Sequence, residues 1–225
     1  MSNFATLFSR CVGPALARQL ALADLLGDRG WNVNISEQKV QFGDDLEFPI
    51  QLLGTEAEEA GTWLWAWANA QSNLPPTLVQ VANQLRDYGQ KHGIVELTVR
   101  SFGLDVADGH SLSLVASGLH GKSCYYRGPY DGGALFFLVL DPPAEILAPV
   151  PTERALTVLS EVISIFSVDH VAMAESFLKS QGFTQEKSPG RLTATRGDDV
   201  ITLTFDDQQR LANMEAQVKP RAAGS

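Results

Sequence analysis

The chain has 225 residues, of which 44% are hydrophobic and 19% charged, a composition typical of globular proteins. Its formal net charge of −9, with the 17 Lys and Arg unclustered, argues against a nucleic-acid partner, because phosphate binding needs a basic patch. No uncharged apolar run is long enough to span a bilayer. Arg10 and Arg18 interrupt the first apolar segment, which argues against a secretory signal. We therefore expect a cytoplasmic protein that binds neither nucleic acid nor membrane.

Hydrophobic periodicity predicts the elements of the first 141 residues. In chain order they are a helix at 4–26, a hairpin at 31–42, strands at 46–53 and 62–68, and a helix at 75–92. Residues 94–100 could form a short strand or a helical turn, and we prefer the strand. A helix from Asp108 to Leu119 and strands at 123–130 and 134–141 follow. Gly13-Pro14 should kink the first helix or divide it in two, because proline lacks a backbone donor. Pro49 should place part of its strand at an edge or a bulge.

A proline-rich stretch at 141–153 marks the predicted boundary of a second unit. Beyond it we expect two helices, at 152–166 and 169–181, capped by Thr152 and Asp169. The remaining segments alternate between strands and turns, with strands at 183–187, 191–196, 200–205 and 211–218. Residues 222–225 are expected to be disordered.

These elements predict an α+β fold. A curved antiparallel sheet with helices packed on one face should occupy residues 1–145, and a small helix and β-meander unit residues 152–218. The sequence leaves open whether the second unit is independent or packs onto the first.

Three tryptophans stand at alternate positions in the segment GTWLWAWAN, residues 61–69. Because side chains alternate in a strand, Trp63, Trp65 and Trp67 are expected on one face. One interpretation makes them core residues whose indole N–H groups bind carbonyls. The other makes them the floor of a groove for a ligand or partner, with Asn69 orienting what binds there.

The TWLWAWAN segment, preceded by a helix and a meander and followed by a proline-initiated helix, resembles a bacterial family of unknown function. The resemblance covers roughly residues 1–140, and the T-W-x-W-x-W-A-N strand is its specific element. It implies a shared fold in a bacterial cytoplasm and implies no activity.

A second candidate site is the hairpin segment YYRGPYD. Tyr125, Tyr126, Arg127, Tyr130 and Asp131 offer stacking surfaces and an anion-binding group on a loop held by strands. The alternative is cross-strand tyrosine packing with a surface ion pair between Arg127 and Asp131.

Other groups favour structural interpretations. Glu56 and Glu58 lead into the tryptophan strand and could act as acid and base, although a solvated loop is the simpler interpretation. Cys11 and Cys124 are expected to be free thiols. The segment GLHGKSC fails as a phosphate loop because a helix precedes it, and four scattered histidines predict no metal site. No cofactor is expected.

The function predicted from these observations is a non-enzymatic binding or interaction module for an unknown protein or small molecule, using the tryptophan face. The alternative is a small hydrolase of a sugar-like substrate with Glu56 or Glu58 as the acid. A third possibility is a structural role in an oligomer that buries the indoles between chains.

Overall fold

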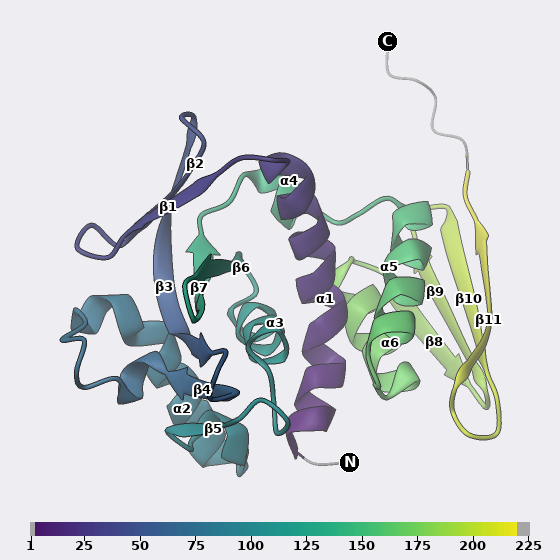
Figure 1. Ribbon diagram of the computed structural model, residues 1–225. Coiled ribbons are helices and arrows are strands. Elements are labelled where there is room, and N and C mark those ends of the chain that lie inside the picture. The colour runs from purple at the N-terminus through teal and green to yellow at the C-terminus, as the bar shows by residue number, and fades with distance from the viewer. Residues whose placement is uncertain (1–2, 220–225) are drawn as a thin grey trace.

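The computed structural model describes residues 3–219 and has the predicted α+β fold. Two antiparallel sheets lie at opposite ends of the molecule, with helices between them (Figure 1). The first sheet is on the left of Figure 1, and the long α1 (Asn3–Leu26) crosses the middle. Helices α5 (Thr152–Ile165) and α6 (His170–Ser180) lie between α1 and the second sheet. Helix α1 therefore stands at the centre of the layers.

Helix α1 is continuous through Pro14, so the expected division into two helices is wrong. Pro14 is buried, and Gly13 lies directly against Phe177 of α6, where an added Cβ would come within 2.8 Å of the Phe177 Cβ. The Gly13-Pro14 pair therefore serves the close approach of another helix.

Seven strands of the described chain form the first sheet, all paired antiparallel. They are β1 (Trp31–Asn34), β2 (Lys39–Phe42), β3 (Leu46–Ala57), β4 (Thr62–Trp65), β5 (Ser101–Gly103), β6 (Ser123–Tyr130) and β7 (Gly133–Leu140). Strand β3 is the centre, because it pairs with β2, β4 and β7 and bulges between Leu52 and Gly54. A bulge bends the strand, which suits the curved sheet that the sequence predicts.

The remaining helices of this region are short. They are η1 (Ala66–Ala68), η2 (Pro76–Val79), α2 (Gln80–His92), η3 (Val95–Leu97), α3 (Gly109–His120) and α4 (Ala144–Leu147). Asp108 caps α3 as expected, since its side chain accepts from the Ser111 backbone N–H. The proline-rich stretch is not purely extended, because α4 forms within it and buries Ile146.

The strand predicted at 94–100 is wrong. Ile94 and Leu97 are the buried residues there, and a spacing of three fits a helical turn rather than a strand. The backbone N–H groups of Thr98 and Val99 both bond to the Val95 carbonyl, which closes the turn before β5 begins.

The second sheet is the predicted meander, in the order β11-β10-β9-β8. Its unit consists of α5 (Thr152–Ile165), α6 (His170–Ser180), β8 (Thr184–Ser188), β9 (Arg191–Arg196), β10 (Asp199–Phe205) and β11 (Leu211–Gln217). Asp169 caps α6 as predicted, whereas Thr152 does not cap α5 and instead donates to Asp199. Residues 222–225, expected to be disordered, lie outside the described residues.

This second unit packs onto α1. The Ser9 hydroxyl accepts from the Asp169 backbone N–H at 3.0 Å, and the Ser176 hydroxyl donates to the Arg10 carbonyl at 2.6 Å. The rings of Phe8 and Phe166 meet edge to face at 5.3 Å. Helix α1 thus joins both units into one layered structure.

Candidate functional site

The tryptophan strand ends earlier than predicted. Strand β4 stops at Trp65, and residues 66–68 form a 3₁₀ turn, so the three indoles do not share one face. Trp63 and Trp65 are 0% exposed, and their rings meet edge to face at 5.3 Å. The Trp65 indole donates to the Glu96 carbonyl at 3.0 Å. Both residues belong to the core, and neither offers a surface to a ligand.

Trp67 and Asn69 have local partners. Trp67 is half-buried, and the guanidinium of Arg86 lies 5.0 Å from its ring centroid. The Asn69 side-chain oxygen accepts from the Ser72 backbone N–H at 3.2 Å, as asparagine commonly does in turns. Trp67 therefore lies under an arginine rather than in an open groove.

The five hairpin residues are also dispersed. Tyr125 is buried with its hydroxyl 3.0 Å from His110 Nδ1, while Tyr126 packs against Phe42, with ring centroids 4.8 Å apart. Adjacent strand residues point to opposite faces, so these two phenols do not converge.

The expected pair between Arg127 and Asp131 is wrong. Arg127 pairs with Glu58, at 3.4 Å between Nη2 and Oε1, and Tyr130 and Asp131 are exposed at the turn. Arg127 reaches Glu58 because β6 lies beside β7, which in turn pairs with β3.

The solvated loop expected for the glutamates is wrong for Glu56. Strand β3 runs four residues beyond the prediction, to Ala57, and buries Glu56. Its carboxylate accepts from the Gly109 backbone N–H at 2.7 Å, at the first turn of α3, where the helix dipole favours negative charge. Glu58 is exposed in its ion pair. Neither lines one of the two pockets described below.

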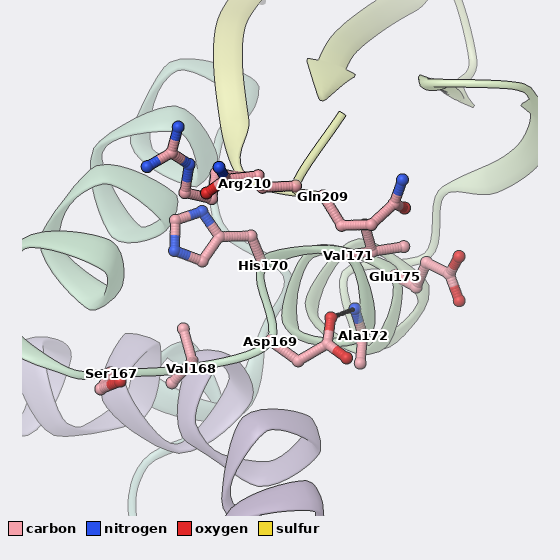
Figure 2. A pocket seen from close by; sticks show the side chains of 10 residues that line it. Ser167, Val168, Asp169, His170, Val171, Ala172, Glu175, Gln209 and Arg210 are labelled. Atoms are coloured by element: carbon pink, nitrogen blue, oxygen red, sulfur yellow. Dashed lines mark hydrogen bonds between the residues drawn. The ribbon is translucent and has the colours of Figure 1, made fainter. Parts of the chain in front are cut away.

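Figure 2 shows an open pocket of about 660 Å³ between the start of α6 and the turn joining β10 to β11. His170 projects into it with a fixed ring, because its Nδ1 accepts from the Leu211 backbone N–H at 3.0 Å. The charged groups there already have partners: Arg210 binds Asp206 and Glu175 binds Lys187. Two charged side chains of this pocket therefore lie beside an opposite charge, and Asp169 caps α6 by accepting from the Ala172 backbone N–H.

A second pocket, of about 280 Å³, differs in this respect. It lies where α1 and the end of α3 meet α4 and α6, and we call it the junction pocket. Its lining residues are Arg10, Pro14, Ala17, Arg18, Gly118, Gly121, Ile146, Leu147, Ala148, Val150, Ser176, Ser180 and Gln181. Two arginines and no carboxylate are among them, in a protein whose net charge is −9.

Arg18 is fixed by the end of α3. Its Nη2 donates to the Ser117 carbonyl at 2.8 Å, and its Nε donates to the Ser123 carbonyl at 3.0 Å. Burial is the main cause that lowers the pKa of Arg18 from its usual value. Within residues 3–219 no ion pair joins Arg18 to a carboxylate. The guanidinium is therefore a largely desolvated cation held by neutral oxygens.

Two thiols flank Arg18. Cys11 and Cys124 are buried and free, as predicted. Burial raises the pKa of each thiol to about 12, and the nearby charge of Arg18 opposes that shift only in part. Both thiols are therefore protonated at neutral pH and supply no countercharge to Arg18.

Sequence reasoning missed the junction pocket, although one signal was present. Arg10 and Arg18 lie in an apolar helix with no acidic residue within five positions of either one. Where such a cation is buried, its partner must come from another element or from a ligand. Which of the two applies depends on tertiary packing.

A family model described as a family of unknown function, DUF6882, matches residues 5–143. Comparison with the curated proteins and with the solved structures gave no match. Among residues 3–219, no helix has the length and apolar character needed to cross a membrane.

Proposed function

The chain belongs to DUF6882, a family of unknown function, and we propose that it is a non-enzymatic binding module for a small molecule. The ligand binds in the junction pocket. One observation carries this proposal: the pocket combines four helices of both units with a desolvated guanidinium, Arg18, whose charge no carboxylate balances among the described residues.

The composition of the pocket supports a ligand rather than water alone. Its lining is more polar than apolar and joins the apolar side chains of Ile146 and Leu147 to the guanidinium groups of Arg10 and Arg18, so it suits a polar rather than an apolar ligand. Its volume of about 280 Å³ is close to the lower end of the roughly 300–1,000 Å³ typical of ligand pockets. The expected ligand is therefore small.

We also propose that the protein acts in a bacterial cytoplasm, as the sequence resemblance implies. Two free, buried thiols support a reducing compartment, because disulfides are rare there. The net charge of −9 supports a partner other than nucleic acid.

The test is a thermal-shift screen of the full chain against a library holding neutral, cationic and anionic small molecules. We expect some compounds to raise Tm, because a ligand that binds only the folded state stabilises it. The matched variant is Ala148→Trp, since Ala148 is exposed at the pocket wall and a large ring there fills the space.

Ala148→Trp should remove the ligand-dependent shift in Tm and leave the ligand-free Tm nearly unchanged. If no compound stabilises the protein, or if every stabilising compound still acts on Ala148→Trp, the junction pocket is not a ligand site.

A further inference from the structure

We propose that the ligand of the junction pocket carries an oxyanion, a phosphate or a carboxylate group, which binds Arg18 and Arg10. The inference rests on the proposed function, because it names the chemistry of the ligand in the same pocket. Two guanidinium groups and no carboxylate line the pocket, although the molecule as a whole is acidic.

Arg18 keeps a donor for a ligand. Its Nε and Nη2 are used by the Ser117 and Ser123 oxygens. Within residues 3–219, Arg18 Nη1 has no acceptor. Side-chain polar atoms that are fully enclosed and have no partner do occur in this protein, but Arg18 Nη1 is not one of them. It is therefore accessible, at a residue that lines the pocket. The end of α3 fixes the guanidinium plane, so an anion that binds Nη1 does not have to order the side chain.

Arg10 supplies the second cation. It lies eight residues before Arg18 on α1, a rise of about 12 Å along the helix. Within residues 3–219 no hydrogen bond or ion pair engages its guanidinium, and the side chain is exposed. A flexible arginine at this distance can fold over a ligand or hold the far end of one.

The other polar side chains of the pocket bind within the protein, so the arginines are the groups expected to bind the oxyanion. The hydroxyl of Ser176 donates to the Arg10 carbonyl, and the hydroxyl of Ser180 donates to the Phe177 carbonyl. Gln181 uses its side-chain oxygen for the Val150 N–H. Guanidinium groups are the natural donors for planar or tetrahedral oxyanions.

The experiment measures Tm and calorimetric affinity with two probes, inorganic phosphate and succinate, at constant ionic strength set by chloride. Because phosphate stabilises folded proteins in general by exclusion from their surface, the readout is the difference between variants. At a probe concentration ten times Kd, we expect Tm of the unmodified protein to rise by about 3–5 °C.

The variants are Arg10→Gln, Arg18→Gln and the control Arg191→Gln. All three remove one positive charge, but Arg191 is exposed on β9 and does not line the pocket. Arg10→Gln and Arg18→Gln should each weaken binding by about 10- to 100-fold, the value of a charged hydrogen bond. Arg191→Gln should bind as the unmodified protein does.

Arg10→Gln keeps the test decisive even if Arg18→Gln fails to fold, because the Arg10 side chain makes no hydrogen bond among residues 3–219. Equal stabilisation of the unmodified protein, Arg10→Gln and Arg191→Gln would overturn the inference. Preference for phosphate over succinate would identify a phosphate group, and the reverse a carboxylate.

The two proposals fail differently. If neutral compounds bind and Ala148→Trp blocks them, while neither anion binds, the binding function stands and the oxyanion is wrong. If nothing binds in the pocket, both proposals are wrong.

Discussion

Two arginines are partly buried in comparable surroundings, Arg18 in α1 and Arg196 in β9. Each donates to backbone carbonyls: Arg18 to those of Ser117 and Ser123, Arg196 to those of Val150 and Gln181. Both side chains lose part of their hydration. In their bonds to carbonyls the two are alike.

They differ in countercharge. Arg196 Nη2 also donates to the Thr152 hydroxyl at 3.2 Å, and that hydroxyl donates to the buried carboxylate of Asp199 at 2.6 Å. A negative charge is thus built into the network of Arg196. Around Arg18 the described residues provide neutral oxygens, protonated thiols and His120, whose pKa is lowered by burial and by the charge of Arg18. A carboxylate of the protein therefore balances the charge of Arg196, whereas a ligand is proposed to balance the charge of Arg18.

The largest effect should come from Arg196→Met. This change leaves Asp199 buried in a network that has lost its cation, and breaking such a network costs about 3–5 kcal/mol. Urea unfolding would measure the loss of unfolding free energy. A cost below about 1 kcal/mol would show that Asp199 does not depend on Arg196.

Arg18→Met should cost less, about 1–2 kcal/mol, in the absence of ligand. The variant loses bonds to two carbonyls but strands no opposite charge, and it removes a desolvated cation. The same urea experiment gives the value. A loss equal to that of Arg196→Met would indicate an undetected countercharge and would break the comparison.

The two buried indoles extend the comparison to neutral groups. The Trp65 N–H has a carbonyl partner, whereas the Trp63 N–H has none among the described residues. Trp65→Phe should therefore cost about 1 kcal/mol more than Trp63→Phe, because it leaves the Glu96 carbonyl unpaired. Paired denaturation curves test this order, and the reverse order would contradict it.

The last prediction concerns the thiols beside Arg18. With pKa values of about 12, Cys11 and Cys124 should not react with a thiol reagent at pH 8 while the protein is folded. The unfolded thiols ionise near the ordinary value of 9.0, so the free energy of unfolding should fall as pH rises from about 9 to 12. Rapid labelling of native protein would contradict this burial.

Periodicity predicted most of the fold. The meander of the second unit, the Asp108 and Asp169 caps and the apolar β7 follow from patterns within a few residues. The errors occur where a contact between distant residues determines the local structure. Glu56 was assigned to a loop, because the sequence does not show that its partner is the Gly109 N–H, 53 positions away.

The candidate site was harder to predict. The three closely spaced tryptophans were predicted to form a possible binding face. Residues 66–68 instead turn the chain, and Trp63 packs beside Gly54 in the core. Arg10 and Arg18 carry no motif. Their importance depends on the end of α3 and on α6, which the sequence alone could not place beside α1.

The most direct measurement is a crystal structure of the full chain, purified without phosphate or sulfate and then soaked in selenate near its solution Kd. Selenate is an oxyanion that anomalous scattering can locate. We expect a selenium peak in the junction pocket, with an oxygen within hydrogen-bond distance of Arg18 Nη1. A pocket without selenate, or with Arg18 paired to a carboxylate of the protein, would contradict the account.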